Sequence, residues 1–193
     1  MEILTWILLW FGAWTFCNFI RYKKGKPFNY LFHTIFFLVS SVFSYLILEK
    51  YIILNLQNLI IGTLCSVGIG LILSQTPTFY KRIRVGRYYP IFLPFNILFQ
   101  QLFVVAGIYI LQMMFMGRYY DFYFGILFTL VHLPVIFLKW ARLRYLYLVF
   151  TLFCGTLFSF LIRNYEFGSL VSFMVHFIVY IPLIYYLRDE RKI

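Results

Sequence analysis

Long apolar runs separated by short polar segments set the pattern of this chain. Each run is about 18–27 residues long, which fits a membrane hydrocarbon core about 30 Å thick. A helix is expected in each run, because it satisfies its backbone hydrogen bonds within one segment. The pattern predicts an all-α, polytopic membrane protein whose seven transmembrane helices cover residues 3–20, 31–48, 53–74, 90–116, 120–139, 145–162 and 169–187.

The basic residues are distributed unevenly between the two ends of the predicted helices. The side reached by the 21–30 loop receives fourteen of the 17 Lys and Arg residues, and the other side receives Lys50, Arg118 and Arg163. Cytoplasmic loops carry the excess of Lys and Arg, so the basic side is predicted to be cytoplasmic. The N-terminus then lies outside and the C-terminus inside. The fourteen are Arg21, Lys23, Lys24, Lys26, Lys81, Arg82, Arg84, Arg87, Lys139, Arg142, Arg144, Arg188, Arg191 and Lys192.

The composition supports a membrane protein and accounts for the charge. Hydrophobic residues make up 63% of the chain and charged residues 12%, with a mean hydropathy of +0.86. A soluble domain carries about 25% charged residues. The net charge of +11 would suggest a nucleic-acid partner in a soluble protein. Here the predicted topology explains the excess, so the expected partner is the lipid bilayer and not nucleic acid.

The predicted helices form one transmembrane domain over residues 1–193. Helices one to three occupy residues 1–89, helices four to seven occupy residues 90–187, and residues 188–193 form a cytoplasmic tail. Basic residues follow the first apolar run and do not precede it, which is the opposite order to that of a cleaved signal peptide. We therefore expect the first helix to be retained.

No cofactor or metal is predicted. Cys17, Cys65 and Cys154 lie singly in apolar runs and form no CxxC pair, so neither a disulfide framework nor a thiolate metal site is implied. A zinc site built on His132 and His176 would lack a third good ligand.

Polar side chains recur at similar depths in three of the predicted helices. At about 1.5 Å per residue, Gln100 lies ~15 Å below the cytoplasmic surface, His132 ~10 Å, His176 ~17 Å and Tyr180 ~10 Å. Intramembrane ionisable residues are functional candidates. Interhelical hydrogen bonding, worth roughly 0.6–2 kcal/mol per bond, is the alternative role. The candidate pocket residues are Gln100, Gln101, Phe128, His132, His176 and Tyr180.

Three short motifs follow one another in the second half of the chain. They are a Gln-Gln pair at 100–101, Phe-x-x-x-His ending at His132, and a Gly-Ser-Leu segment at 168–170 that leads to His176. With this order and spacing, residues 90–187 resemble the CPBP intramembrane proteases, which include type II CAAX prenyl endopeptidases and bacteriocin-processing or immunity proteins. The family motifs are Glu-Glu-x-x-x-Arg, Phe-x-x-x-His and His-x-x-x-Asn. The resemblance implies a CPBP-like helical bundle in a prokaryotic inner or plasma membrane.

The chain departs from the family motifs at the positions that carry the chemistry. Gln100 and Gln101 replace the two glutamates, Val105 replaces the arginine, and Tyr180 replaces the asparagine. In the family, the first glutamate is thought to activate water with one motif histidine. The other histidine and the asparagine are thought to stabilise the oxyanion. A carboxamide does not accept a proton near neutral pH, so Gln100 cannot serve as the general base.

These departures predict a pseudoenzyme, catalytically inactive but retaining the family fold. Its expected role is to bind another membrane protein or a transmembrane peptide, as a partner, scaffold or assembly factor. One alternative is an active CPBP endopeptidase with diverged motifs, in which His132 acts as the base and Tyr180 donates a hydrogen bond to the oxyanion. The other is a transporter or channel component, although no Asp or Glu is predicted within the membrane for the usual ion relay, since Asp121 lies at the outer end of its helix.

Overall fold

The regular secondary structure in the described part of the protein consists of helices. A computed structural model describes residues 5, 8, 12, 30–50, 55–76, 89–114, 119–133 and 144–187. Within them no strand occurs, which confirms the all-α prediction for this part of the chain. The helices are α2 (Tyr30–Leu48), α3 (Leu56–Gln75), α5 (Tyr89–Met114), α6 (Tyr120–His132), α7 (Arg144–Asn164) and α8 (Gly168–Leu187).

Three of the described helices are long and apolar enough to cross a membrane. They are Leu56–Gln75, Tyr89–Met114 and Tyr145–Asn164, with hydropathies of 1.9, 1.9 and 2.0. Two shorter apolar helical stretches, Thr34–Leu48 and Gly168–Ile181, accompany them. The first predicted helix lies almost wholly outside the described residues, so the structure gives no bounds for it.

The predicted helix bounds agree with the observed ones to within a few residues wherever the structure describes both. The predicted helix over 120–139 is observed as α6, which ends at His132, and residues 134–139 of that prediction lie outside the described residues. Leu133 closes the helix with a tighter bond, its backbone N–H donating to the carbonyl of Leu130. Residue 134 is proline, which has no backbone N–H to continue the helical ladder.

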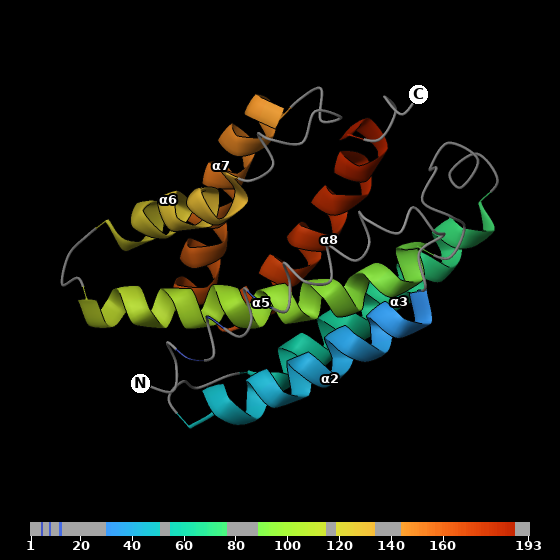
Figure 1. Cartoon of the computed structure of the whole chain (residues 1–193), viewed down its shortest axis with the longest axis horizontal. Helices are drawn as coiled ribbons and strands as arrows, with labels where there is room; N and C mark the ends of the chain where they lie inside the picture. Colours follow the sequence, from blue (N-terminus) through green and yellow to red (C-terminus); the bar gives the residue numbers. More distant parts are fainter. Residues whose placement is uncertain are drawn as a thin grey trace.

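Helix α5 lies at the centre of the arrangement (Figure 1). Helices α2 and α3 pack on one side of it, and α6, α7 and α8 lie on the other, with α3 also reaching α8. The side chains from Phe99 to Ile108 are all buried, on every face of the helix. A helix that is apolar all round suits such a surrounded position. The two carboxamides of the sequence therefore lie in the most enclosed part of the molecule.

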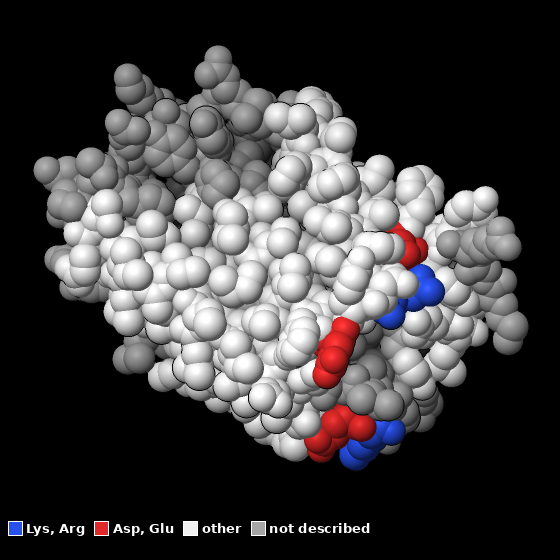
Figure 2. Space-filling view, turned by 180° about the vertical axis from the view of Figure 1, so that it is seen from behind, with Lys and Arg blue, Asp and Glu red and all other residues white. Residues whose placement is uncertain are grey.

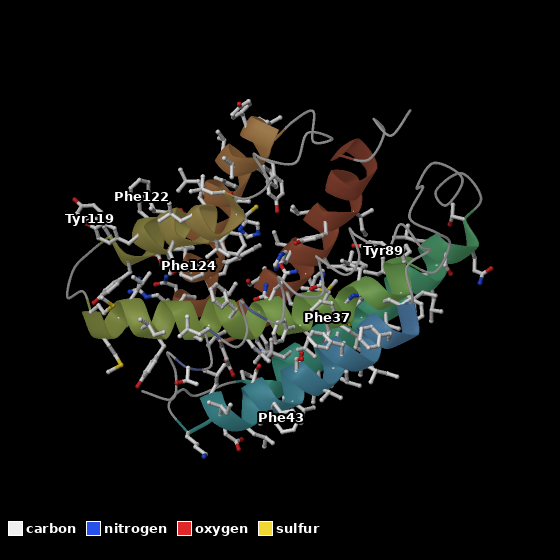
Figure 3. The ribbon with its side chains drawn as sticks, in the orientation of Figure 1. Phe37, Phe43, Tyr89, Tyr119, Phe122 and Phe124 are labelled. Carbon is white, nitrogen blue, oxygen red and sulfur yellow. The ribbon has the colours of Figure 1, made fainter. Side chains whose placement is uncertain are left out.

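Aromatic side chains fill the spaces on both sides of α5. The ring of Phe37 on α2 lies 5.7 Å from that of Phe99 on α5, and Phe124 on α6 is 1% exposed. Figure 3 shows Phe37 and Phe124 lying between helices, whereas Phe43 and Phe122 lie on the outside of the bundle. Outward-facing Phe is compatible with contact to lipid chains, and inward-facing Phe builds the core.

Helices α6 and α7 approach closely through glycine. A Cβ atom placed on Gly125 would overlap the hydroxyl of Thr156 and lie 2.8 Å from the carbonyl oxygen of Leu152. A Cβ on Gly155 would lie 2.7 Å from the Cβ of Phe128. Small residues allow this close backbone packing, which is common between membrane helices. The contact fixes the position of Phe128 and, one turn further, of His132.

The charged side chains that the structure describes gather at one edge of the molecule. Figure 2 shows them towards the lower right of a face whose other described residues are uncharged. This edge lies at the lower left in Figure 1, which is seen from the opposite side. The C-terminal ends of α2, α5 and α7 and the N-terminal ends of α3, α6 and α8 point towards it. The described charged side chains are Glu49, Lys50, Asp121, Arg163 and Glu166.

Candidate functional site

Gln101 connects α5 to α8 through its carboxamide. The hydroxyl of Ser172 donates to Oε1 of Gln101 at 3.1 Å, and Nε2 of Gln101 lies 3.0 Å from Nδ1 of His176. Gln101 and Ser172 are 0% exposed and His176 is 3% exposed. Ser172 and His176 lie one helical turn apart on the same face of α8, so one side chain can reach both. This contact sets the register of α8 against α5.

The surroundings of Gln101 determine which way its carboxamide points. Nε2 also lies 3.5 Å from the backbone carbonyl oxygen of Ser172. In the structure the amide nitrogen faces this carbonyl oxygen, which can only accept a hydrogen bond, and the amide oxygen faces the Ser172 hydroxyl. The same nitrogen faces the ring of His176, and therefore Nδ1 of His176 is an acceptor.

Gln100 points to a different residue of α8. The hydroxyl of Tyr180 donates to Oε1 of Gln100 at 3.2 Å, and Nε2 of Gln100 donates to Oδ1 of Asn96 at 3.0 Å. Tyr147 on α7 lines the same pocket as Tyr180. The hydrogen bond from Tyr180 to Gln100 therefore joins α8 to α5 beside α7.

His132 is anchored to its own helix. Its Nδ1 donates to the carbonyl oxygen of Phe128 at 2.6 Å, and it is 8% exposed. Its ring centroid lies 4.5 Å from that of Phe128 and 5.7 Å from that of Tyr147. In the described part of the chain, neither carboxamide hydrogen-bonds to His132. Aromatic contact holds His132 next to the network that joins α5 and α8.

Both histidines line one small pocket at the junction of α6, α7 and α8. The Phe128 ring lies 6.3 Å from the His176 ring, so it contacts both imidazoles. The pocket has a volume of about 20 Å³, and a cavity needs roughly 10–15 Å³ to hold a water molecule. The lining residues are Phe128, His132, Tyr147, Phe150, Thr151, Cys154, Phe158, His176, Val179 and Tyr180.

The structure divides the predicted site residues into two groups. Phe128, His132, His176 and Tyr180 line the pocket, whereas the neighbouring carboxamides of α5 lie behind it and support it. Sequence reasoning missed the partners Asn96 and Ser172. Each lies four residues before a predicted site residue, so the helical spacing could have identified them. Tyr147 was also missed, because its contribution depends on how α7 is rotated in the bundle.

A second polar contact joins α6 and α7 at the charged edge. Oδ1 of Asp121 accepts hydrogen bonds from the hydroxyl of Ser159 at 2.6 Å and from Nη1 of Arg163 at 3.2 Å. The guanidinium of Arg163 lies 4.7 Å from the centre of the Tyr120 ring. These contacts fix the other end of the pair of helices that carries the pocket.

The donor set around the pocket offers little to a metal ion. Among the described residues, no group of three or more His, Cys, Asp or Glu side chains is placed to hold one. One nitrogen of each histidine is already engaged, by Phe128 in one ring and by Gln101 in the other. The chemistry available to the pocket is hydrogen bonding through imidazole nitrogens and phenol hydroxyls.

Comparison of the chain with protein-family models, with curated proteins and with solved structures finds no match. The fold and the site define a class: an all-helical protein with three described helices able to cross a membrane and a buried polar network between α5 and α8.

Proposed function

We propose that this protein is a seven-helix membrane protein resembling the CPBP proteases but lacking their activity. It acts by binding another membrane protein or a transmembrane peptide, as a scaffold or assembly factor. The observation that carries this proposal is the hydrogen bonding of Gln101 to Ser172 and His176. At positions where the resemblance implies carboxylates, the chain has carboxamides whose oxygens and nitrogens are used to hold α8 in place.

This use of the carboxamides supports a structural role over a catalytic one. A general base must accept a proton from water, and a carboxamide does not do so near neutral pH. A buried carboxylate in hydrocarbon would also carry a large desolvation cost, which a carboxamide avoids. Replacement of Glu by Gln therefore keeps the shape and the hydrogen bonds of the site while removing both the charge and the reaction.

The proposed topology places the N-terminus outside and the C-terminus in the cytoplasm of a prokaryotic inner or plasma membrane. The three apolar helices and the gathering of the described charged residues at one edge support it. That edge would be the outer surface. The basic segments 21–30, 75–89 and 188–193 would then lie on the cytoplasmic side, in agreement with the positive-inside rule.

The pocket is the proposed contact point for the partner segment, and crosslinking tests this. Phe150 lines the pocket and is also 38% exposed, so it is accessible from outside the bundle. A photoreactive phenylalanine analogue at position 150, activated in native membranes, should produce a discrete protein adduct.

The matched control is the same analogue at Phe43, which is 63% exposed on α2. It should give lipid adducts alone. Lipid adducts at both positions, or one and the same protein adduct at both, would contradict a partner site at the pocket.

A second function, endopeptidase activity with diverged residues, is favoured by one observation. His132, His176 and the Tyr180 side chain line the same pocket, so an imidazole base and hydrogen-bond donors lie close together. In such an enzyme, cleavage of a transmembrane peptide would be lost on His132→Ala. Retention of cleavage by His132→Ala would eliminate this mechanism.

A further inference from the structure

Two imidazoles line the pocket between α6, α7 and α8. In each ring Nδ1 already has a partner outside the pocket. His132 comes from α6 and His176 from α8, and both rings contact Phe128. An uncharged imidazole has one N–H donor and one acceptor nitrogen. The partner of the engaged nitrogen therefore decides what the remaining nitrogen, Nε2, offers to a ligand.

In His176 the remaining nitrogen is a donor. The NH₂ group of Gln101 faces Nδ1 at 3.0 Å and lies 3.5 Å from the carbonyl oxygen of Ser172, while Oε1 accepts from the Ser172 hydroxyl. Nδ1 must then accept, and the ring proton resides on Nε2.

In His132 the remaining nitrogen is an acceptor. Its Nδ1 lies 2.6 Å from the carbonyl oxygen of Phe128, and a carbonyl oxygen cannot donate. The ring proton therefore resides on Nδ1, and Nε2 keeps its lone pair. The two histidines carry their protons on opposite nitrogens, each fixed by a partner outside the pocket.

From this pairing we propose that the pocket is a binding site for a single hydroxyl oxygen, either water or the hydroxyl of a small ligand. A hydroxyl group carries both the donor that Nε2 of His132 requires and the acceptor that Nε2 of His176 requires. The volume of about 20 Å³ admits a group of this size. From the two imidazoles, a metal ion would need two lone pairs and finds one, whereas a carboxylate would need two N–H donors and also finds one.

The direct test uses the full-length protein in lipid nanodiscs, labelled with ¹⁵N at histidine. The chain has three histidines, and His33→Gln removes the third signal. The ¹⁵N shifts should show an Nδ1–H tautomer for His132 and an Nε2–H tautomer for His176. Methanol, the hydroxyl probe, should shift both rings with saturation, while formate and Co²⁺ should not.

The outcomes separate the two sources of the hydroxyl. Saturable shifts with methanol identify a site open to alcohols, and a slowly exchanging water signal at both rings without methanol binding identifies a water site. Either result supports the proposal. Matching tautomers in the two histidines, tight Co²⁺ binding, or equal shifts with formate would overturn it.

The variant Gln101→Leu tests the cause. It removes the NH₂ group that faces Nδ1 of His176. The ring proton of His176 should then distribute over both nitrogens. Hydroxyl binding should weaken about tenfold, the effect of losing roughly one hydrogen bond. Gln100→Leu is the matched control, because Gln100 bonds to Tyr180 and not to His176. It should leave the His176 tautomer unchanged, and an unchanged tautomer in both variants would contradict the assigned role of Gln101.

Discussion

At the level of single residues, Gln100 and Gln101 are neighbours in the chain but have different partners. Consecutive residues of a helix point about 100° apart, as 3.6 residues per turn require. Gln101 meets Ser172 and His176, whereas Gln100 meets Tyr180 one turn further along α8. The sequence identified both carboxamides as candidates by their depth. It could not assign their partners, because helix rotation is set by packing and not by local sequence.

Gln101→Leu should lower the free energy of unfolding more than Gln100→Leu. It leaves the buried Ser172 hydroxyl and the His176 ring without a partner, at a cost of about 1–3 kcal/mol. Gln100 forms one of its two hydrogen bonds within its own helix, to Asn96. Replacing Gln100 therefore removes one interhelical hydrogen bond, which is worth roughly 0.6–2 kcal/mol. Denaturant-induced unfolding in bicelles measures both variants.

Ser172→Ala serves as the control for this comparison, since it removes one of the two α8 partners and should give an intermediate loss. Equal stabilities for Gln101→Leu and Gln100→Leu would contradict the assignment of Gln101 as the principal contact between α5 and α8.

At the level of helices, apolar run length was sufficient to predict where most of them begin and end. Each predicted run from 31–48 onward contains an observed helix, and α2 ends at the predicted residue, Leu48. The pairing of helices was not predictable. Gly125 and Gly155 determine how α6 approaches α7, yet the sequence analysis assigned no role to either residue. Membrane helices are joined by shape more than by apolar area, so their neighbours depend on which surfaces interlock.

Gly125→Ala should destabilise the protein by about 1–3 kcal/mol, because an extra methyl group in a tight contact forces the helices apart. The new Cβ would overlap the Thr156 hydroxyl and press on the Leu152 carbonyl. A lower melting temperature in detergent is the expected result.

Gly68→Ala on α3 is the matched control. Nothing lies within 4 Å of the position a Cβ would take there. Alanine should be neutral or stabilising, by up to about 1 kcal/mol from its higher helix propensity. A destabilisation as large as that of Gly125→Ala would indicate that the close packing of α6 and α7 is not the cause.

At the level of the whole molecule, charge distribution links the sequence to the proposed orientation. The described charged residues at one edge include Glu49, Lys50, Asp121, Arg163 and Glu166, all of which the charge pattern assigns to the outer side. The basic segments at 21–26, 81–87 and 188–192, which the charge pattern assigns to the cytoplasmic side, lie outside the described residues. The number of spans and their orientation therefore follow from the sequence pattern and stay predictions.

Cysteine labelling tests the orientation in intact cells. In a background without the native cysteines, Glu49→Cys and Glu166→Cys should react with a membrane-impermeant thiol reagent added outside, since both residues are exposed at the charged edge. Arg84→Cys, in the predicted cytoplasmic loop, should react after permeabilisation alone. Labelling of Arg84→Cys in sealed cells would contradict the N-terminus-out arrangement.

A cleavage assay in proteoliposomes tests most directly whether this protein binds membrane segments without peptidase activity while keeping the carboxamide network. Purified wild-type protein and His132→Ala are incubated with transmembrane peptides, among them the segment captured by crosslinking at position 150. Neither form should cleave any peptide above the protein-free background, while binding of the captured segment is retained. Turnover by the wild type that is abolished by His132→Ala would contradict it.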